Sequence, residues 1–239
     1  AVVAAKFWQA KQALAAVVVA WDLPPLSSVD SAKVRADYEQ LMDSPEGESA
    51  ESAGELESGF AGAQGVVEGR YWAPYLAHAP MEPMNAVIKI EGDKAELWSG
   101  TQGPGIAQGL VARYAGLDKE NVTVHQTYLG GAFGRRATLT HVIEATQVAL
   151  EAKKPIHLLW TREDDIKSGV YRPASLMNIK AGLDDSGKIV AWAAKRVGGN
   201  ITPGTLRAAL PGVMPAAVSD GVVDWVVGLS SDVMDGWVV

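Results

Sequence analysis

A glycine-rich segment with two arginines, Gly130-Gly-Ala-Phe-Gly-Arg-Arg136, has the residue types of an anion-binding loop. Residues 122–129 before it alternate β-branched and aromatic side chains and predict a strand, whereas residues 139–152 after it have helical apolar spacing. Glycine lets the backbone approach a ligand closely, and helix N-terminal N–H groups and guanidinium groups both attract anions. An anion site is therefore one interpretation, and a tight turn with two solvated arginines is the other.

A second glycine loop, Gly100-Thr-Gln-Gly-Pro-Gly105, lies between a predicted strand over 95–99 and a predicted helix over 106–115. Its glycines invite a dinucleotide-binding interpretation, but Gln108 stands where the third glycine of Gly-x-Gly-x-x-Gly belongs. No acidic residue ends a following strand at a distance of about twenty residues, as that fold requires. The segment is thus a glycine loop at a helix start, of the same construction as the first.

Two further groups of polar residues could do chemistry. His78 and Glu82 could act together as ligands or as an acid and a base, although the two prolines of their loop favour a structural role. The cluster Arg162-Glu-Asp-Asp165 could be catalytic, but a helix N-terminus or surface ion pairing explains it equally well.

Composition excludes several classes of function. The 239 residues have a net charge of −7, which argues against a nucleic-acid surface because phosphate binding needs clustered Lys and Arg. Cysteine is absent, so this chain itself holds no disulfide, thiolate nucleophile or iron–sulfur cluster. No apolar run reaches the length of a membrane-spanning helix.

The elements expected to position these groups alternate between hairpin signals and amphipathic segments. Helices are predicted over 7–16 and 31–42, the latter capped by Ser27, Ser28 or Asp30. Strands are predicted over 17–21, 66–76, 87–91, 95–99, 155–160, 177–183 and 189–197. Residues 44–65 are acidic and small, which predicts an exposed loop and a domain boundary, and few periodic signals follow residue 198. The expected fold class is α+β, with mixed sheets and flanking helices.

Five segments in this order resemble the molybdenum-binding large subunit of the xanthine dehydrogenase and aldehyde oxidase family. They are Tyr75-Leu-Ala-His-Ala-Pro-Met-Glu-Pro-Met-Asn-Ala86, Thr101-Gln-Gly-Pro104, Gly130-Gly-Ala-Phe-Gly-Arg-Arg136, Trp160-Thr-Arg-Glu-Asp-Asp165 and Tyr171-Arg-Pro173. The branch that they resemble most is the isoquinoline 1-oxidoreductase β-subunit type. Residues 1–65 are then expected to be the C-terminal part of an α/β hammerhead-type domain with an acidic linker. Residues 66–239 are expected to be the first molybdopterin-binding domain, incomplete at its C-terminal end.

The resemblance implies a molybdopterin cofactor with molybdenum, in bacteria usually in its cytosine dinucleotide form. Gln102 matches the glutamine that contacts the molybdenum oxo group, and Phe133 and Gly134 match the loop that packs over the metal and pterin. The predicted cofactor-binding residues are Gln102, Gly103, Gly131, Ala132, Phe133, Gly134 and Arg135. No direct metal ligand is predicted in this chain.

The implied reaction hydroxylates an aldehyde or an electron-poor heterocyclic carbon with oxygen from water. Electrons would pass to a small [2Fe–2S] subunit and, in this branch, often on to a cytochrome c. The expected partners are therefore the remainder of the large subunit, the [2Fe–2S] subunit, the cytochrome and a small-molecule substrate.

Two departures from the family pattern bear on function. Ala137 stands where xanthine dehydrogenases have a glutamate that binds purine, so a purine substrate is not expected. The family's catalytic glutamate belongs to a Gly-x-Gly-Glu motif that this sequence lacks, so no catalytic residue is predicted here and the chain alone should be inactive. The alternative is a non-catalytic scaffold or interaction fragment that binds no cofactor.

Overall fold

The computed structural model describes residues 1–22, 30–45, 47, 49–214 and 221–227 of the chain. The chain divides into two compact units: unit 1 comprises residues 1–23, 77–171 and 203–228, and unit 2 comprises 24–76, 172–202 and 229–239. The short strands β2 (Leu76–Ala77) and β7 (Tyr171–Arg172) lie where the chain passes from one unit to the other. The domain boundary at residue 65, which rests on the family resemblance, stays a prediction.

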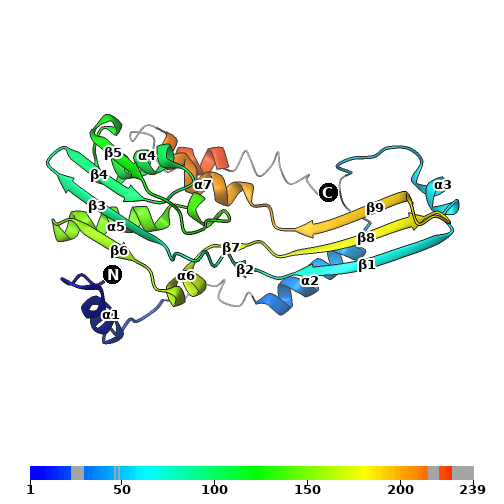
Figure 1. Ribbon diagram of the computed structural model, residues 1–239, viewed down its shortest axis with the longest axis horizontal. Helices are drawn as coiled ribbons and strands as arrows, with labels where there is room; N and C mark the ends of the chain where they lie inside the picture. Colours follow the sequence, from blue (N-terminus) through cyan, green and yellow to red (C-terminus); the bar gives the residue numbers. More distant parts are fainter. Residues whose placement is uncertain (23–29, 46, 48, 215–220, 228–239) are drawn as a thin grey trace. The chain divides into compact units, whose positions relative to one another are not determined.

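Unit 1 contains a four-stranded mixed sheet in the order β5-β4-β3-β6 (Figure 1). Its strands are β3 (Asn85–Glu91), β4 (Lys94–Ser99), β5 (Val122–Gln126) and β6 (Ile156–Leu159). Its helices include α1 (Phe7–Ala15), α4 (Pro104–Ala115), α5 (Thr140–Ala152) and α6 (Arg162–Ser168), with 3-10 turns η2 (Lys119–Asn121) and η3 (Arg135–Ala137). The predicted β3–β4 hairpin is confirmed, and α4 connects β4 to the parallel strand β5.

Alternation along the strands gives this sheet one apolar face and one polar face. Ile88 and Leu97 are completely buried (0% exposed each) in a core cluster that they share with α4 and α5. On the opposite face Trp98 stacks on His125 with ring centroids 4.6 Å apart, and His125 Nε2 lies 2.9 Å from Glu96 Oε2. The core therefore lies between the sheet and the two helices.

The sequence analysis missed a helix, α7 (Thr202–Val213), in the region of few periodic signals. A Cβ atom at Gly109 of α4 would lie 1.7 Å from the carbonyl oxygen of Gly212 in α7, so only glycine permits this close approach. The helix contains Pro211, Gly204 and Gly212, and residues of these types ordinarily mark loops or helix ends, so its composition predicted no helix. A further helical segment spans residues 221–227.

Unit 2 is a three-stranded antiparallel sheet in the order β1-β8-β9 with α2 packed on it. Its elements are α2 (Ser31–Asp43), α3 (Leu56–Ala61), β1 (Gly65–Ala73), β8 (Ser175–Leu183) and β9 (Ile189–Gly198). A small core joins Met42, Leu176 and Val197 with the partly buried Tyr38 and Trp72. The predicted cap is confirmed at Asp30, whose side chain accepts a hydrogen bond from Lys33 N–H at 2.8 Å; residues 27 and 28 lie outside the described part.

Local predictions were wrong in two places. Residues 17–21 form no strand, and Val18 is 95% exposed. β-branched composition is not enough for a strand, because an isolated strand leaves its backbone groups without partners. The acidic stretch 44–65 includes the short helix α3, although its described residues are mostly exposed as expected.

None of the helices in the described ranges combines the length and the apolar character that crossing a membrane would require.

Candidate functional site

Three loops meet at one end of the sheet in unit 1. They are the Glu82 loop (residues 78–84) before β3, the Gln102 loop (residues 100–103) after β4, and the glycine–arginine loop (residues 130–136) after β5. β3 is antiparallel to β4 and to β6, while β4 and β5 are parallel. The start of β3 and the ends of β4, β5 and β6 therefore lie at the same edge, and strand pairing brings the loops together.

Arg136 lies at the junction of the three loops and is completely buried (0% exposed). Its guanidinium group donates hydrogen bonds to the backbone carbonyl oxygens of Gly131 (3.1 Å), Gly100 (3.0 Å), Glu82 (3.0 Å) and Pro83 (3.3 Å). Burial lowers the pKa of the Arg136 side chain, and the nearby charge of Glu82 limits that shift. The side chain thus replaces its lost hydration with hydrogen bonds that it donates to carbonyl oxygens of three loops.

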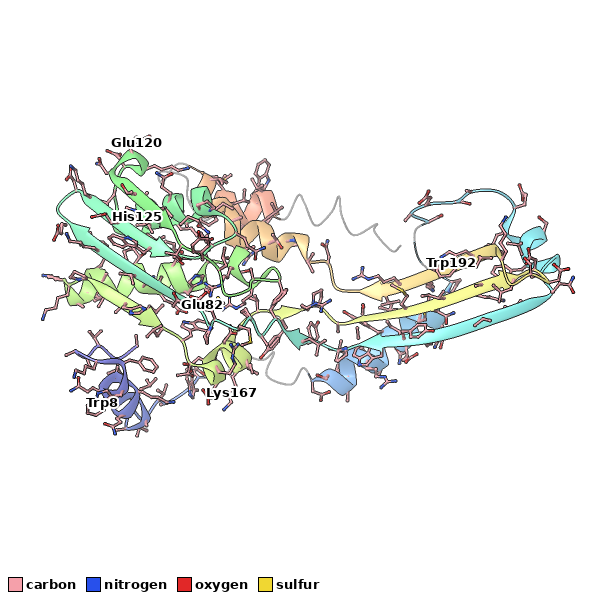
Figure 2. The ribbon with its side chains drawn as sticks, in the orientation of Figure 1. Trp8, Glu82, Glu120, His125, Lys167 and Trp192 are labelled. Atoms are coloured by element: carbon pink, nitrogen blue, oxygen red, sulfur yellow. The ribbon has the colours of Figure 1, made fainter. Side chains whose placement is uncertain are left out.

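Glu82 connects the Glu82 loop with the glycine–arginine loop (labelled in Figure 2). Its Oε2 atom accepts a hydrogen bond from Gly130 N–H at 2.8 Å and lies 2.9 Å from Arg136 Nη2, while Oε1 accepts from Asn85 Nδ2 at 2.8 Å. Burial works to raise the pKa of the Glu82 carboxyl, but the Gly130 and Asn85 hydrogen bonds and the charge of Arg136 together hold it below its ordinary value. Glu82 is thus a structural carboxylate and does not pair with His78, whose Nδ1 atom lies 3.3 Å from Val170 O.

Arg135 points into a second buried network. Its Nε atom donates to Asp165 Oδ1 at 3.3 Å, and its guanidinium group lies 5.1 Å from the ring centroid of Trp160. Arg162 Nη1 donates to the other Asp165 oxygen at 3.0 Å, and Arg162 Nη2 donates to Met81 O at 3.0 Å and to Pro80 O. The charged cluster 162–165 is therefore structural, because Asp165 joins two arginines and Arg162 binds the Glu82 loop.

The same cluster also builds the start of α6. Thr161 and Asp164 form a reciprocal capping box, in which the Thr161 side chain accepts from Asp164 N–H at 3.1 Å and Thr161 N–H donates to Asp164 Oδ2 at 2.9 Å. The structure thus supports the helix-capping interpretation of residues 162–165, and the ion pairs of Asp165 are buried, not on the surface as expected.

The middle of the glycine–arginine loop has an unusual backbone conformation. Gly131 and Gly134 have φ of 96° each and Phe133 has φ of 54°, the left-handed region that bulky residues rarely adopt. Phe133 is 72% exposed. Within the described residues the structure gives no hydrogen-bond acceptor to the N–H groups of Gly131, Ala132, Phe133 and Gly134. Successive N–H groups in such conformations form a concave anion-binding surface.

The Gln102 loop is fixed through its backbone and presents an exposed side chain. Gln102 N–H donates to Arg136 O at 3.1 Å, and Thr101 Oγ1 donates to the same oxygen at 3.3 Å. Gly103 N–H donates to Thr101 Oγ1 at 3.0 Å, and Gln126 Nε2 donates to Thr101 O at 2.8 Å. These bonds leave the exposed Gln102 amide as the polar group that this loop offers to a ligand.

The solvated-arginine interpretation of the sequence needs correction, because Arg135 (1% exposed) and Arg136 (0% exposed) are both buried. The Arg136 guanidinium group is bound to carbonyl oxygens through all three nitrogens, whereas Arg135 Nη2 has no hydrogen-bond partner in the described residues. A direct contact between Arg135 and an anion stays a prediction. Hydrophobic periodicity treats arginine as a surface residue, so nothing in the sequence pattern indicated that Arg136 binds carbonyl oxygens of distant loops or that Arg135 binds the carboxylate of Asp165. The N–H groups of residues 131–134, which have no acceptor in the described residues, still support the hypothesis of an anion site.

The sequence analysis also missed His141, which is 0% exposed at the first turn of α5. Burial, followed by the positive charges of Arg135 and Arg136, lowers the pKa of His141 to about 3, so it is neutral near neutral pH. Its Nε2 atom lies 3.5 Å from Ser99 Oγ, and Nδ1 has no hydrogen-bond partner in the described part of the chain. A single histidine in an apolar helical pattern does not indicate that its side chain will be buried beside two arginines.

Across the described ranges, no group of three or more His, Asp or Glu side chains is arranged to hold a metal ion. The polar groups that the loop junction offers are the backbone N–H groups of residues 131–134 and the amide of Gln102.

Comparison with known proteins identifies the family of this chain. Residues 42–214 match the family model of the molybdopterin cofactor-binding domain. The chain is 32% identical over 192 residues to isoquinoline 1-oxidoreductase subunit beta of Brevundimonas diminuta, covering 77% of this chain and 25% of that protein. It is 28% identical over 177 residues to the aldehyde oxidoreductase molybdenum-binding subunit PaoC of Escherichia coli K12, covering 73% and 24%. The chain thus spans about a quarter of the length of these relatives.

The fold of the chain resembles part of a solved oxidoreductase structure. Quinoline 2-oxidoreductase from Pseudomonas putida 86 superposes with a TM-score of 0.52 and 23% identity, over 59% of this chain and 18% of that chain. The α+β class with mixed sheets is therefore confirmed. This chain belongs to the molybdopterin cofactor-binding domain family, as part of a molybdenum-binding subunit of the xanthine dehydrogenase and aldehyde oxidase type.

Proposed function

We propose that this chain forms one wall of the molybdopterin site in an oxidoreductase that hydroxylates an aldehyde or an N-heterocycle with oxygen from water. The observation that supports the proposal best is the row of backbone N–H groups from Gly131 to Gly134 that lack acceptors in the described residues. The phosphate and dithiolene groups of the cofactor are anionic, and such a row of donors suits them.

The donors of the loop and of the arginine next to it also fit an anionic cofactor. The charges of Arg135, Arg136 and Arg162 are balanced by those of Glu82, Asp165 and Glu144. The fit therefore rests on the backbone N–H groups of residues 131–134 and on Arg135 Nη2, a buried donor that has no hydrogen-bond partner in the described residues. The residues of this chain therefore fit the anionic groups of molybdopterin.

Each predicted contact has a distinct role in this proposal. The N–H groups of Gly131, Ala132, Phe133 and Gly134 would bind the cofactor, and the exposed Phe133 ring would exclude water from it. Gln102 would present its amide, with Gly103 beside it. Arg135 would support the loop from below, because its guanidinium group is bound to Asp165. Bound molybdopterin would supply the redox centre for the two-electron oxidation.

The remaining parts of the reaction lie outside this chain in the proposal. The remainder of the large subunit would supply the catalytic base and the opposite wall. The cofactor would be the cytosine dinucleotide form, and electrons would pass to a small [2Fe–2S] subunit and then to a cytochrome c. Ala137 argues against a purine substrate, since the position holds no carboxylate.

The proposal is tested on the complete subunit isolated with its native partners. We expect molybdenum and pterin in stoichiometric amounts, and we expect Phe133→Ala and Gln102→Ala to lower turnover more than they lower the melting temperature. Both side chains are exposed, so their loss should cost little stability. A complete, folded assembly without molybdenum would instead support the scaffold alternative.

A further inference from the structure

We infer that Arg136 is a positioning residue that sets the Gln102 loop and the glycine–arginine loop relative to each other without touching the cofactor. The inference rests on the proposed function, which places both loops at the cofactor. A residue that controls their spacing would control how well the chain binds molybdopterin.

Arg136 bonds to both loops through its side chain and its backbone. Nε donates to Gly131 O at 3.1 Å, at the start of the row of N–H groups without acceptors, and Nη1 donates to Gly100 O at 3.0 Å, at the start of the Gln102 loop. The Arg136 carbonyl oxygen accepts from Gln102 N–H at 3.1 Å. One residue therefore fixes the backbone on both sides of the proposed site.

The third anchor is the Glu82 loop. Nη2 of Arg136 donates to Glu82 O at 3.0 Å and Pro83 O at 3.3 Å, and it lies 2.9 Å from the Glu82 carboxylate. That carboxylate also accepts from Gly130 N–H at 2.8 Å. The Glu82 loop and the glycine–arginine loop are thus connected twice, through the Arg136 guanidinium group and through the bond between Glu82 and Gly130 N–H.

Only the arginine fork can make these contacts together. A guanidinium group has five N–H donors in one plane, whereas a lysine has its donors on a single nitrogen. Arg136→Lys keeps the charge but cannot reach the carbonyl oxygens of Gly100, Gly131 and Pro83 at once. This variant therefore separates positioning from charge.

The neighbouring Arg135 offers a matched comparison. It is as buried as Arg136, at 1% against 0% exposed, but its side chain bonds to Asp165 and to Thr138 O. Replacing either arginine should destabilise the protein, because each leaves buried acceptors without donors. Only the replacement of Arg136 should release the Gln102 loop.

The experiment compares hydrogen exchange and cofactor retention in the full subunit. Arg136→Lys, Arg135→Lys and wild type are analysed, with Arg70→Lys in unit 2 as a control for a surface arginine. In Arg136→Lys we expect the amides of Gln102 and Gly130 to exchange about tenfold faster, since that factor corresponds to losing about one hydrogen bond to a charged group. We also expect molybdenum and pterin to be lost on dialysis, while Arg70→Lys retains both.

The outcomes distinguish the inference from the proposed function. A wild-type subunit without molybdopterin would contradict the proposed function, and the exchange data would then still test the loop positions. Unchanged exchange at Gln102 in Arg136→Lys, or equally fast exchange there in Arg135→Lys, would overturn the inference. If Arg136→Lys does not fold, Glu82→Gln is analysed instead. We then expect faster hydrogen exchange at the Gly130 amide and unchanged exchange at the Gln102 amide. Unchanged exchange at Gly130 would overturn the inference.

Discussion

Units 1 and 2 both use basic side chains to bind backbone carbonyl groups, but in different surroundings. In unit 1, Arg136 is completely buried and its acceptors belong to three loops. In unit 2, the half-buried Lys195 donates from Nζ to Leu41 O (3.2 Å), Met42 O (2.9 Å) and Ser44 O at the end of α2, while the exposed Arg70 pairs with side chains of α2.

The difference shows how burial turns an ordinary contact into a geometric constraint. A buried guanidinium group must satisfy its donors within the protein, so its partners have little freedom to move. An exposed cation can exchange each partner for water, and it therefore contributes little and constrains little. In unit 1 the buried cation Arg136 lies at the candidate site, whereas in unit 2 the half-buried Lys195 and the exposed Arg70 lie along α2.

The sharpest test of this contrast removes one carboxylate charge in each unit. Asp165→Asn in unit 1 removes the negative charge and turns one of the two acceptor oxygens into an NH2 donor that faces an arginine, and we expect the free energy of unfolding to fall by about 3–5 kcal/mol. Asp37→Asn in unit 2 breaks only a surface pair with Lys33 and should cost less than about 0.5 kcal/mol. Urea denaturation measures both, and similar losses for the two variants would contradict the contrast.

Acid should weaken unit 1 through His141. The unfolded chain binds a proton near the ordinary histidine value of 6.5, whereas the folded protein holds the pKa of His141 at about 3. Because the unfolded state binds more protons between these values, the free energy of unfolding should fall by up to about 1.4 kcal/mol per pH unit as pH drops from about 6.5. Above that pH the histidine adds no pH dependence.

The contribution of His141 is isolated by comparing wild type with His141→Gln, which does not titrate. Carboxylates such as Glu82 also titrate in acid, so the quantity to measure is the difference between the two pH profiles of stability. We expect the wild-type profile to be steeper between pH 6.5 and 5. Parallel profiles would mean that His141 is protonated in the folded protein.

Close packing of the loops should make Gly130 intolerant of a side chain. A Cβ atom there would lie 2.4 Å from Glu82 Cβ, so Gly130→Ala should cost about 1–3 kcal/mol of stability. Gly105→Ala, at the start of α4, meets nothing within 4 Å and should be neutral or stabilising by up to about 1 kcal/mol. Thermal unfolding of both variants checks the expectation, and a tolerated Gly130→Ala would show that the loops can separate.

The smallest expected effect lies in unit 2. Lys195→Met removes the donor at the end of α2 and should cost about 1 kcal/mol, because the carbonyl groups of Leu41 and Ser44 can turn to water. Lys188→Met, in the exposed turn before β9, is the control. A loss as large as that of Asp165→Asn would place unit 2 in the same class as unit 1.

Much of the local structure was predictable because it depends on neighbouring residues. The hairpin around Gly92 and Asp93, the helix over 106–115 and the Asp30 cap all follow from turn composition, apolar spacing and short-range hydrogen bonds. The predicted strand over 17–21 does not form, because a strand needs a partner strand. Helix α7 was missed, because its proline and glycine residues are typical of loops.

The sequence by itself determined the family, the α+β class and the segments that form the candidate site, since motif order and apolar patterns are properties of the chain. Tertiary structure alone decided what the two arginines do. Arg136 binds carbonyl oxygens of residues up to 54 positions away, and Arg135 binds a carboxylate 30 positions away. Burial of a charge depends on which distant acceptors surround it, and a linear pattern does not contain that information.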